Sequence, residues 1–168
     1  FPYTTLFRSD PDTVAGIFAG TITKWNDAKI AATNPDAKLP DANITAVHRS
    51  DDSGTTNNFT DYLAQAAPTV WTQPAADTFP AAFGGAAAKG PPAVVDAVTT
   101  GTNTIGYADA SAAGKLGHAE LKVGDAWLKP TAEAAAKIVD ESAVLPGRGE
   151  HDLALKLNRV SKDAYPAV

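Results

Sequence analysis

The chain alternates between apolar patterns with the spacing of a helix and short apolar runs typical of strands. After Asp10, which is a suitable helix cap, Val14, Ile17 and Phe18 fall on one helical face. A second short helix is predicted over 28–33. These two segments open the predicted fold with helices.

A strand, a polar loop and a helix are predicted next. The β-branched run "ANITAVHR" follows Pro40 and favours a strand. In "TTNNFTDYLAQAA", the residues Phe59, Tyr62 and Leu63 stand at i, i+3 and i+4, which predicts an amphipathic helix. The loop between these two elements is strongly polar.

The second half of the chain begins with a segment, 67–92, that is rich in Ala, Pro and Gly and is predicted to be irregular, with Trp71, Phe79 and Phe83 as its large anchors. "PAVVDAVTTG" predicts a helix, "NTIGYAD" a strand, "ELKVGDAWLKP" a hairpin around Gly124, and "TAEAAAKIVD" a helix. The alternation of strands and helices predicts an α/β class.

Composition narrows the possible partners. The 168 residues carry a formal charge of −5, which argues against a footprint on nucleic acid or on an anionic membrane. Any bound anion must therefore be held locally. The absence of cysteine excludes disulfides and zinc-thiolate sites but leaves the redox compartment open. No apolar run approaches the roughly 20 residues that a membrane-spanning helix needs.

The polar loop "HRSDDSGTTNNF" holds the candidate chemistry. A loop that opens a helix presents unpaired N–H groups and the positive end of the helix dipole, which together attract anions. Gly54 lets a ligand approach the backbone, and Arg49 offers a planar fork for an oxyanion. Hydroxyl donors are supplied by Ser53, Thr55 and Thr56. We expect Asp51 to pair with Arg49 and orient it. These features favour a tetrahedral oxyanion.

The same residues have a simpler interpretation. Ser53, Thr55 and Asp52 are all common helix-capping types, Gly54 suits a turn, and Arg49 could be an ordinary surface residue. The local pattern alone leaves both interpretations open.

Other chemistries fit the sequence less well. Neither "SDDSGTT" nor "GGAAAKGP" supplies a Walker loop. Ser53, His48 and Asp51 have the composition of a hydrolytic triad, but the glycine expected two residues before the serine is missing and the three residues lie too close along the chain. His48, His118 and His151 share no metal-ligand spacing. We predict no catalytic residue, no metal site and no cofactor.

A resemblance extends the interpretation. "IFAGTITKWNDAKIAATNPDAKLPDANITAVHRSDDSGTTNNFTDYL" is similar to the phosphate-binding subunit of bacterial high-affinity phosphate ABC importers. The similarity continues less tightly through "KGPPAVVDAVTTGTNTIGYADASAA" and "KPTAEAAAKIVD" to "DAYPAV". It implies a partial type II periplasmic-binding-protein fold, mainly the second lobe, with a mixed sheet flanked by helices.

The resemblance also implies roles for individual residues. Arg49, Ser53, Gly54 and Thr55 match the phosphate-binding positions of the family, and Asp51 matches the residue that tethers the arginine. Asp52 stands where the family usually has glycine, and this extra carboxylate is expected to face solvent or to weaken anion affinity. The family's first lobe, which carries the acceptor for the proton of hydrogen phosphate, has no counterpart in this chain, so full selectivity against sulfate is not expected.

The implied domain organisation has three parts. Residues 1–9 are interpreted as a possible non-native scar, 10–129 as the second phosphate-binding lobe, and 130–168 as a return segment toward the first lobe. The apolar faces of "AEAAAKIVD" and "DLALKLNRV" are expected to lack their partners, so that the isolated chain could aggregate. The full-length protein is expected to be a monomer.

The function implied by the resemblance is that of an extracytoplasmic solute-binding protein, periplasmic or at the cell surface. It would capture inorganic phosphate and deliver it to the membrane subunits of an ABC permease. Two alternatives remain. One is a phosphoester hydrolase or transferase that uses Ser53, and the other is a receptor for another tetrahedral oxyanion such as sulfate.

Overall fold

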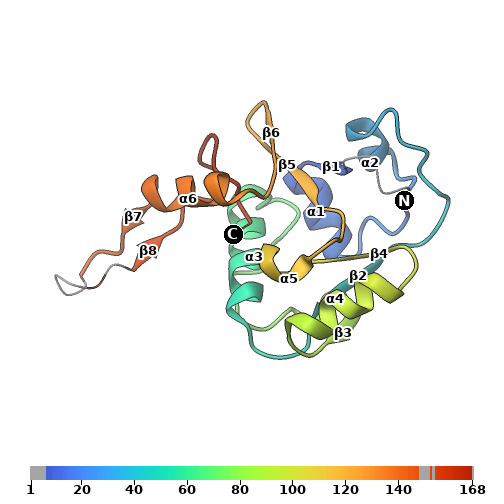
Figure 1. Cartoon of the computed structure of the whole chain (residues 1–168), viewed down its shortest axis with the longest axis horizontal. Helices are drawn as coiled ribbons and strands as arrows, with labels where there is room; N and C mark the ends of the chain where they lie inside the picture. The colour runs from blue at the N-terminus through green and yellow to red at the C-terminus, as the bar shows by residue number, and fades with distance from the viewer. Residues whose placement is uncertain (1–6, 148–151, 153, 168) are drawn as a thin grey trace.

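The computed structural model describes residues 7–147, 152 and 154–167 (Figure 1). The helices are α1 (Pro11–Phe18), α2 (Ala28–Thr33), α3 (Gly54–Ala66), α4 (Gly90–Thr100), α5 (Ala110–Ala113) and α6 (Ala132–Asp140), with a 3-10 turn η1 (Ala81–Phe83). The strands are β1 (Phe7–Ser9), β2 (Thr45–Arg49), β3 (Ala86–Ala88), β4 (Thr104–Gly106), β5 (Ala119–Val123), β6 (Ala126–Leu128), β7 (Ala143–Val144) and β8 (Leu155–Lys156).

Three small sheets share the described strands. The first has the order β3-β2-β4 and is parallel throughout, and α4 packs against all three of its strands. The second has the order β1-β5-β6, with β1 parallel to β5 and β5–β6 forming an antiparallel hairpin. The third is the two-stranded β7–β8 ribbon. The predicted α/β class with a mixed set of strands flanked by helices is confirmed.

Helix starts follow the capping signals of the sequence. The side chain of Asp10 accepts a hydrogen bond from the Thr13 amide at 2.8 Å and begins α1. Thr131 caps α6 in the same way by accepting from the Ala134 amide at 3.1 Å. Helix α2 covers the predicted residues, 28–33. Local capping and periodicity were therefore sufficient to locate these helices.

One predicted segment needs correction, and one strand was not predicted. The segment 67–92 was predicted to be irregular, but Ala86–Ala88 form β3 and pair with β2. Gly85 has a φ of +108°, and a Cβ there would lie 2.5 Å from the carbonyl oxygen of Ala46, so the backbones approach too closely for a side chain. The end of the predicted scar is also part of a sheet, because Phe7–Ser9 pair with β5. That residues 1–9 are a non-native scar stays a prediction, and residues 1–6 lie outside the described residues.

The core beneath the polar loop is aromatic. The ring of Phe18 in α1 meets that of Phe59 in α3 edge-on, with centroids 4.7 Å apart. The ring of Tyr107, which follows β4, stacks on Phe59 at 4.4 Å. Trp71 and Phe79 from the irregular segment are buried as well. This cluster joins α1, α3 and the β3-β2-β4 sheet and fixes the start of α3 relative to the end of β2.

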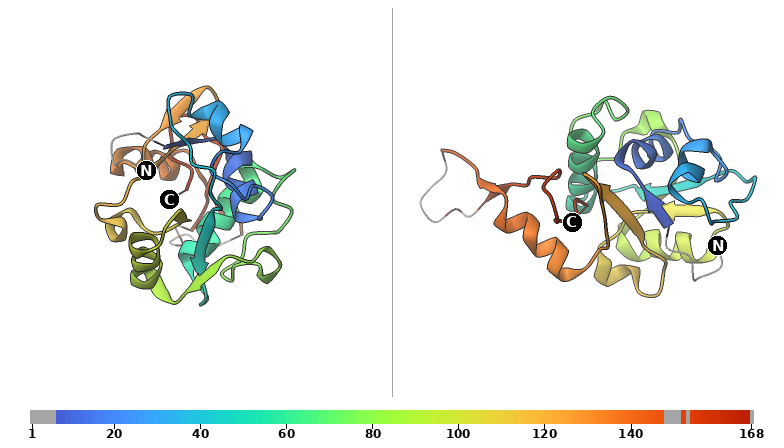
Figure 2. Two further views of the ribbon diagram at one scale, coloured as in Figure 1. Left: turned by 90° about the vertical axis from the view of Figure 1, so that its right-hand side faces the viewer. Right: turned by 90° about the horizontal axis from the view of Figure 1, so that it is seen from above.

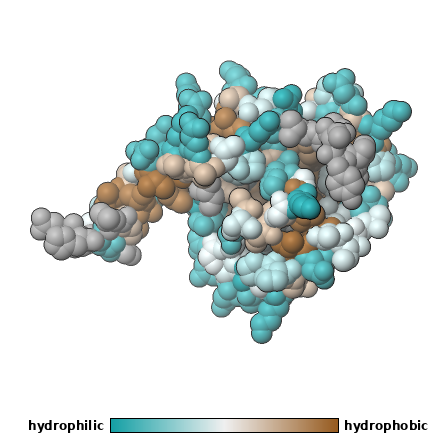
Figure 3. Space-filling model, in the orientation of Figure 1, coloured by the Kyte–Doolittle hydropathy of each residue, from teal (hydrophilic) through white to brown (hydrophobic). Residues whose placement is uncertain are grey.

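The C-terminal part of the chain extends away from this body. Helix α6 and the β7–β8 ribbon project to one side in Figure 1 and in the right-hand view of Figure 2. Figure 3 shows apolar surface along this arm, and Val139 and Val144 are more than half exposed. Ile138 of the same helix is fully buried, so the apolar face of α6 that was expected to lack a partner is exposed only in part.

The segment after β8 returns to the body and is tied to α3 by one buried arginine. The Arg159 side chain is 1% exposed, and its Nε donates to Asp61 at 2.9 Å. Its Nη2 donates to the Asn58 side chain at 2.8 Å and its Nη1 to the Pro166 carbonyl at 3.2 Å. These contacts connect the chain end to the same helix that begins at the polar loop.

Among the described residues, no helix combines the length and the apolar character needed to cross a membrane.

Candidate functional site

The polar loop lies at the carboxyl edge of the parallel sheet. Strand β2 ends at Arg49, and α3 begins at Gly54 with Ser53 as its N-cap. The Ser53 hydroxyl accepts a hydrogen bond from the Thr56 amide at 3.3 Å. No described residue accepts from the amides of Gly54 and Thr55. The first turn of α3 therefore presents two unused N–H donors and the positive end of the helix dipole.

Arg49 and Asp51 form a two-pronged ion pair beside this turn. Arg49 Nε donates to Asp51 Oδ1 at 2.8 Å, and Nη2 donates to Oδ2 at 2.6 Å. The Asp51 carboxylate also accepts from the Gly90 amide at 3.0 Å. Within the described chain, Arg49 Nη1 has no hydrogen-bond partner. The pair that the sequence predicted is present, and it leaves part of the guanidinium available to a ligand.

The electrostatics of this pair keep both groups charged. The hydrogen bonds from Arg49, and then the one from the Gly90 amide, hold the pKa of Asp51 well below its ordinary range. The bond to Asp51 raises the pKa of Arg49. Because the pKa of Asp51 is lowered by folding, its contribution to stability is present above the ordinary aspartate pKa and is lost only as pH falls through the lowered value. The tether therefore persists across neutral and mildly acidic pH.

The remaining predicted residues lie in the same turn. Ser53 is 7% exposed, and its hydroxyl is engaged as the cap. Gly54 is exposed, and a Cβ built there would meet no described atom within 4 Å. The Thr55 hydroxyl donates to Asp109 at the outer limit of hydrogen-bond length, 3.4 Å. The structure thus brings Ser53, Gly54 and Thr55 together at one helix end, and their role in binding a ligand stays a prediction.

Asp52 lies in an exposed position. Its carboxylate accepts a hydrogen bond from the Thr78 hydroxyl at 2.6 Å. This exposure agrees with the first of the two expectations for Asp52, that it faces solvent, and the effect on anion affinity stays a prediction.

Sequence reasoning missed Tyr107. It follows β4, which pairs in parallel with β2, so the ends of both strands meet at the same edge of the sheet. The Tyr107 hydroxyl accepts from the Arg49 amide at 3.2 Å and lies 2.8 Å from the hydroxyl of Thr56. Both strands, "ANITAVHR" and "NTIGYAD", were predicted, but their pairing was not, so the contact between Tyr107 and Arg49 could not be predicted.

The described contacts of His48, Asp51 and Ser53 do not support the alternative of a hydrolase that uses Ser53. The ring of His48 stacks on Phe79 with centroids 4.2 Å apart, and its Nδ1 lies 2.9 Å from the Arg49 carbonyl oxygen. No hydrogen bond joins His48 to Ser53 in the part of the chain that the structure describes. Asp51 is held by Arg49 instead of by a histidine. The three residues do not form a catalytic relay in this arrangement.

The two described histidines, His48 and His118, do not assemble with other possible metal ligands among the described residues. His118 is exposed, and His151 lies outside the described residues. Among the described residues, no group of three or more His, Cys, Asp or Glu side chains could hold a metal ion.

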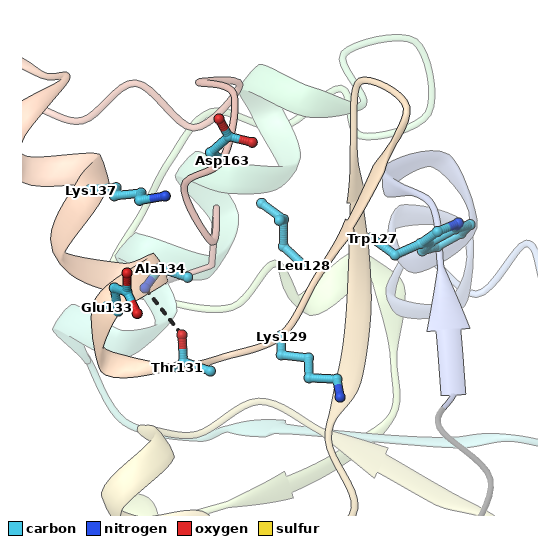
Figure 4. Close-up of a pocket in the computed structure, with 8 residues that line it drawn as sticks. All are labelled: Trp127, Leu128, Lys129, Thr131, Glu133, Ala134, Lys137 and Asp163. Carbon is cyan, nitrogen blue, oxygen red and sulfur yellow. Dashed lines mark hydrogen bonds between the residues drawn. The ribbon is translucent and has the colours of Figure 1, made fainter.

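Two hollows adjoin the fold. The larger has a volume of about 890 Å³, and its lining includes residues of α3, α4, β4 and β5, with Thr55 and Asp109 among them. The smaller, of about 270 Å³, lies between β6, α6 and the chain end (Figure 4). Its lining residues include Trp127, Lys129 and Lys137 and none of the predicted anion ligands. Of these two hollows, the larger borders the polar loop among the described residues.

Comparison with known protein families identifies the family of this chain. The sequence model of one protein family, described as the PBP superfamily domain, matches residues 4–167. The chain belongs to the PBP superfamily. The predicted family resemblance and the α/β periplasmic-binding-protein fold are confirmed.

Individual members of the superfamily resemble the chain over part of their length. The phosphate-binding protein PstS of Xylella fastidiosa is 39% identical over 127 residues, which make up 73% of this chain and 35% of the relative. Phosphate-binding protein PstS2 of Mycobacterium bovis is 32% identical over 160 residues, which make up 94% of this chain and 43% of the relative. The chain spans less than half of each of these two relatives.

A solved structure supports the fold. A high-affinity periplasmic phosphate-binding protein, PfluDING, bound with phosphate, superposes with a TM-score of 0.63. It is 23% identical, and the match covers 80% of this chain and 40% of that protein. At this level of identity the likeness concerns the arrangement of the elements.

Proposed function

We propose that this chain supplies one phosphate-binding surface of an extracytoplasmic solute-binding protein that captures inorganic phosphate and delivers it to an ABC permease. The observation that carries the proposal is the Arg49–Asp51 pair beside the unused amides of Gly54 and Thr55. A fixed guanidinium and aligned N–H groups suit a tetrahedral oxyanion, which needs several donors at once. Relatives named as phosphate-binding proteins support the choice of phosphate.

The proposal assigns Asp51 an indirect role. Its two bonds from Arg49 fix the guanidinium, and its bond from Gly90 fixes the carboxylate. A charged group held in place in this way loses less conformational entropy when it binds a ligand. Asp51 therefore acts as the residue that orients Arg49, while Arg49, Ser53, Gly54 and Thr55 face the anion. No catalytic step is assigned, so Ser53 serves as a cap and donor.

A residue-resolved NMR titration with phosphate, repeated with sulfate, tests the proposal. Saturable shifts are expected at the amides of Ser53, Gly54 and Thr55 and at Arg49 Nε. Lys24→Gln is a matched control, because Lys24 forms an exposed ion pair with Asp41 outside the loop. Equal shifts throughout the chain, or shifts that disappear in the Lys24 variant, would contradict a site in this loop.

Asp52→Asn is expected to increase phosphate affinity modestly. The variant removes a negative charge near the bound anion, and the charge is exposed, so we expect a gain of about twofold at low salt. Asp36→Asn makes the same change in net charge on an exposed residue that follows α2, and it should leave the affinity unchanged. Calorimetry at low and high salt provides the measurement. A loss of affinity in Asp52→Asn would show that the carboxylate supports the site instead of opposing the anion.

A further inference from the structure

The hydroxyl of Tyr107 lies where the two halves of the proposed anion site meet. It accepts from the Arg49 amide at 3.2 Å, at the end of β2, and it lies 2.8 Å from the hydroxyl of Thr56, in the first turn of α3. Both contacts are remote in sequence, because Tyr107 comes from the end of β4. One oxygen atom therefore connects the strand that carries the guanidinium to the helix that carries the amides.

The position of this hydroxyl is well fixed. Tyr107 is 8% exposed, and its ring stacks on Phe59 with centroids 4.4 Å apart and planes 15° apart. Burial raises the pKa of the Tyr107 phenol above its ordinary value, so the hydroxyl keeps its proton at physiological pH. A neutral phenol can accept from one partner and donate to another. It can therefore satisfy the Arg49 amide and Thr56 at the same time.

Thr56 extends the connection to the helix cap. Its side chain is fully buried against Tyr107, and its amide donates to the Ser53 hydroxyl at 3.3 Å. A shift of Thr56 would consequently move both the cap and the two unused amides beside it. On the other side, a shift of the Arg49 main chain would carry the guanidinium and its Asp51 tether with it.

We propose that Tyr107 is a positioning residue of the anion site, one that sets the separation between Arg49 and the first turn of α3 through its hydroxyl. The inference rests on the proposed function. It assigns Tyr107 no contact with the anion. An oxyanion held by donors from two elements needs a fixed separation between them, since ligand groups that are misplaced by a fraction of an ångström lose much of their effect.

Tyr107→Phe tests the inference because it removes only the oxygen. Phosphate affinity is expected to fall roughly fivefold, the effect of one lost hydrogen bond on the geometry of the site. In the free protein, the Nε–H group of Arg49 should lose order, seen as a lower heteronuclear NOE. Tyr165→Phe is the matched control. Tyr165 is also buried, and its hydroxyl donates to the Ala119 carbonyl at 3.3 Å, away from the loop.

A double variant separates positioning from general stability. Tyr107→Phe leaves the buried Thr56 hydroxyl without its Tyr107 partner. Adding Thr56→Val removes that hydroxyl as well, so the melting temperature of the double variant should lie above that of Tyr107→Phe alone. Phosphate affinity should stay low if Tyr107 acts through position. Recovery of affinity together with stability would overturn the inference and make the role purely structural.

The free-state measurement keeps this inference distinct from the proposed function. If the unmodified chain binds no phosphate, the proposed function fails. The positioning role of Tyr107 is then tested by the heteronuclear NOE of the Arg49 Nε–H group alone. An Arg49 Nε–H group that is equally ordered in the unmodified chain, in Tyr107→Phe and in Tyr165→Phe would overturn the positioning role. Loss of order in Tyr107→Phe alone would support it.

Discussion

Replacing Arg49 with methionine is expected to remove most of the phosphate affinity of this chain. The variant deletes a charged donor of the site and leaves Asp51 as a negative group beside the anion, without its Arg49 partner. Loss of one member of a hydrogen-bonded charge pair at a binding site typically costs about 2–5 kcal/mol, roughly 30- to 4,000-fold in Kd. Calorimetric titration with phosphate, supported by the NMR shifts of Gly54 and Thr55, provides the measurement.

Two further variants show how Arg49 acts. Arg49→Lys keeps the charge but cannot engage Asp51 with two parallel bonds, so we expect an intermediate loss of affinity. Arg49→Met with Asp51→Asn removes the repulsive carboxylate as well. If repulsion dominated the effect of Arg49→Met, this double variant would recover affinity. If the direct contact dominates, as we expect, affinity stays low. An Arg49→Met protein that binds phosphate within threefold of the unmodified chain would contradict the proposed site.

The site could be predicted to the extent that it is local in sequence. The strand ending at Arg49, the Ser53 cap and the apolar face of α3 follow from residues a few positions apart. The Arg49–Asp51 pair also spans only two residues. Whether these residues bind an anion or only cap a helix could not be decided by local pattern, because Ser and Gly at a helix start serve both purposes. The resemblance to phosphate-binding subunits favoured anion binding, which stays a prediction for these residues.

The unpredicted parts depend on contacts between distant segments. Tyr107 reaches Arg49 only because β2 and β4 pair in parallel, and the sequence of either strand alone does not determine that pairing. Strand β3 has three alanines and no β-branched residue, so its strand conformation comes from the open edge of β2 and from the close backbone approach at Gly85. Strand β1 was missed in a similar way, because its pairing with β5 gives three residues a conformation that they do not favour strongly by themselves.

The core anchors were easier to predict than their arrangement. Trp71 and Phe79 stood out as large apolar residues in an otherwise small and flexible composition, and both are buried. Their size required burial somewhere. Phe79 stacks on His48 because the irregular segment passes over β2. The path of an irregular segment cannot be predicted from hydrophobic periodicity. The burial of Trp71 and Phe79 could therefore be predicted from residue type, whereas the residues that they contact are determined by the tertiary structure.

Arg159→Met is expected to produce the largest loss of stability among simple substitutions in the C-terminal segment. The Arg159 side chain is 1% exposed and donates to Asp61, Asn58 and the Pro166 carbonyl. Removing one partner of a buried ion pair leaves the other with an uncompensated charge and typically costs about 3–5 kcal/mol. Urea unfolding followed by circular dichroism should show this decrease in the free energy of unfolding. Lys24→Met disrupts the exposed pair with Asp41 and should have little effect.

The effect of Arg159→Met should begin at the chain end. Arg159 fixes the segment after β8 to α3, so its loss is expected to loosen the main chain beside the exposed Lys156 and Lys162 and to speed trypsin cleavage there before the body of the protein unfolds. Asp61→Asn combined with Arg159→Met removes the uncompensated charge and should recover part of the stability without restoring protection from trypsin. Because α3 also begins at the proposed anion site, the chain end and the proposed site are anchored to one helix. Trypsin cleavage at unchanged rates in Arg159→Met would mean that other contacts, such as that of Tyr165 with Ala119, hold the segment in place.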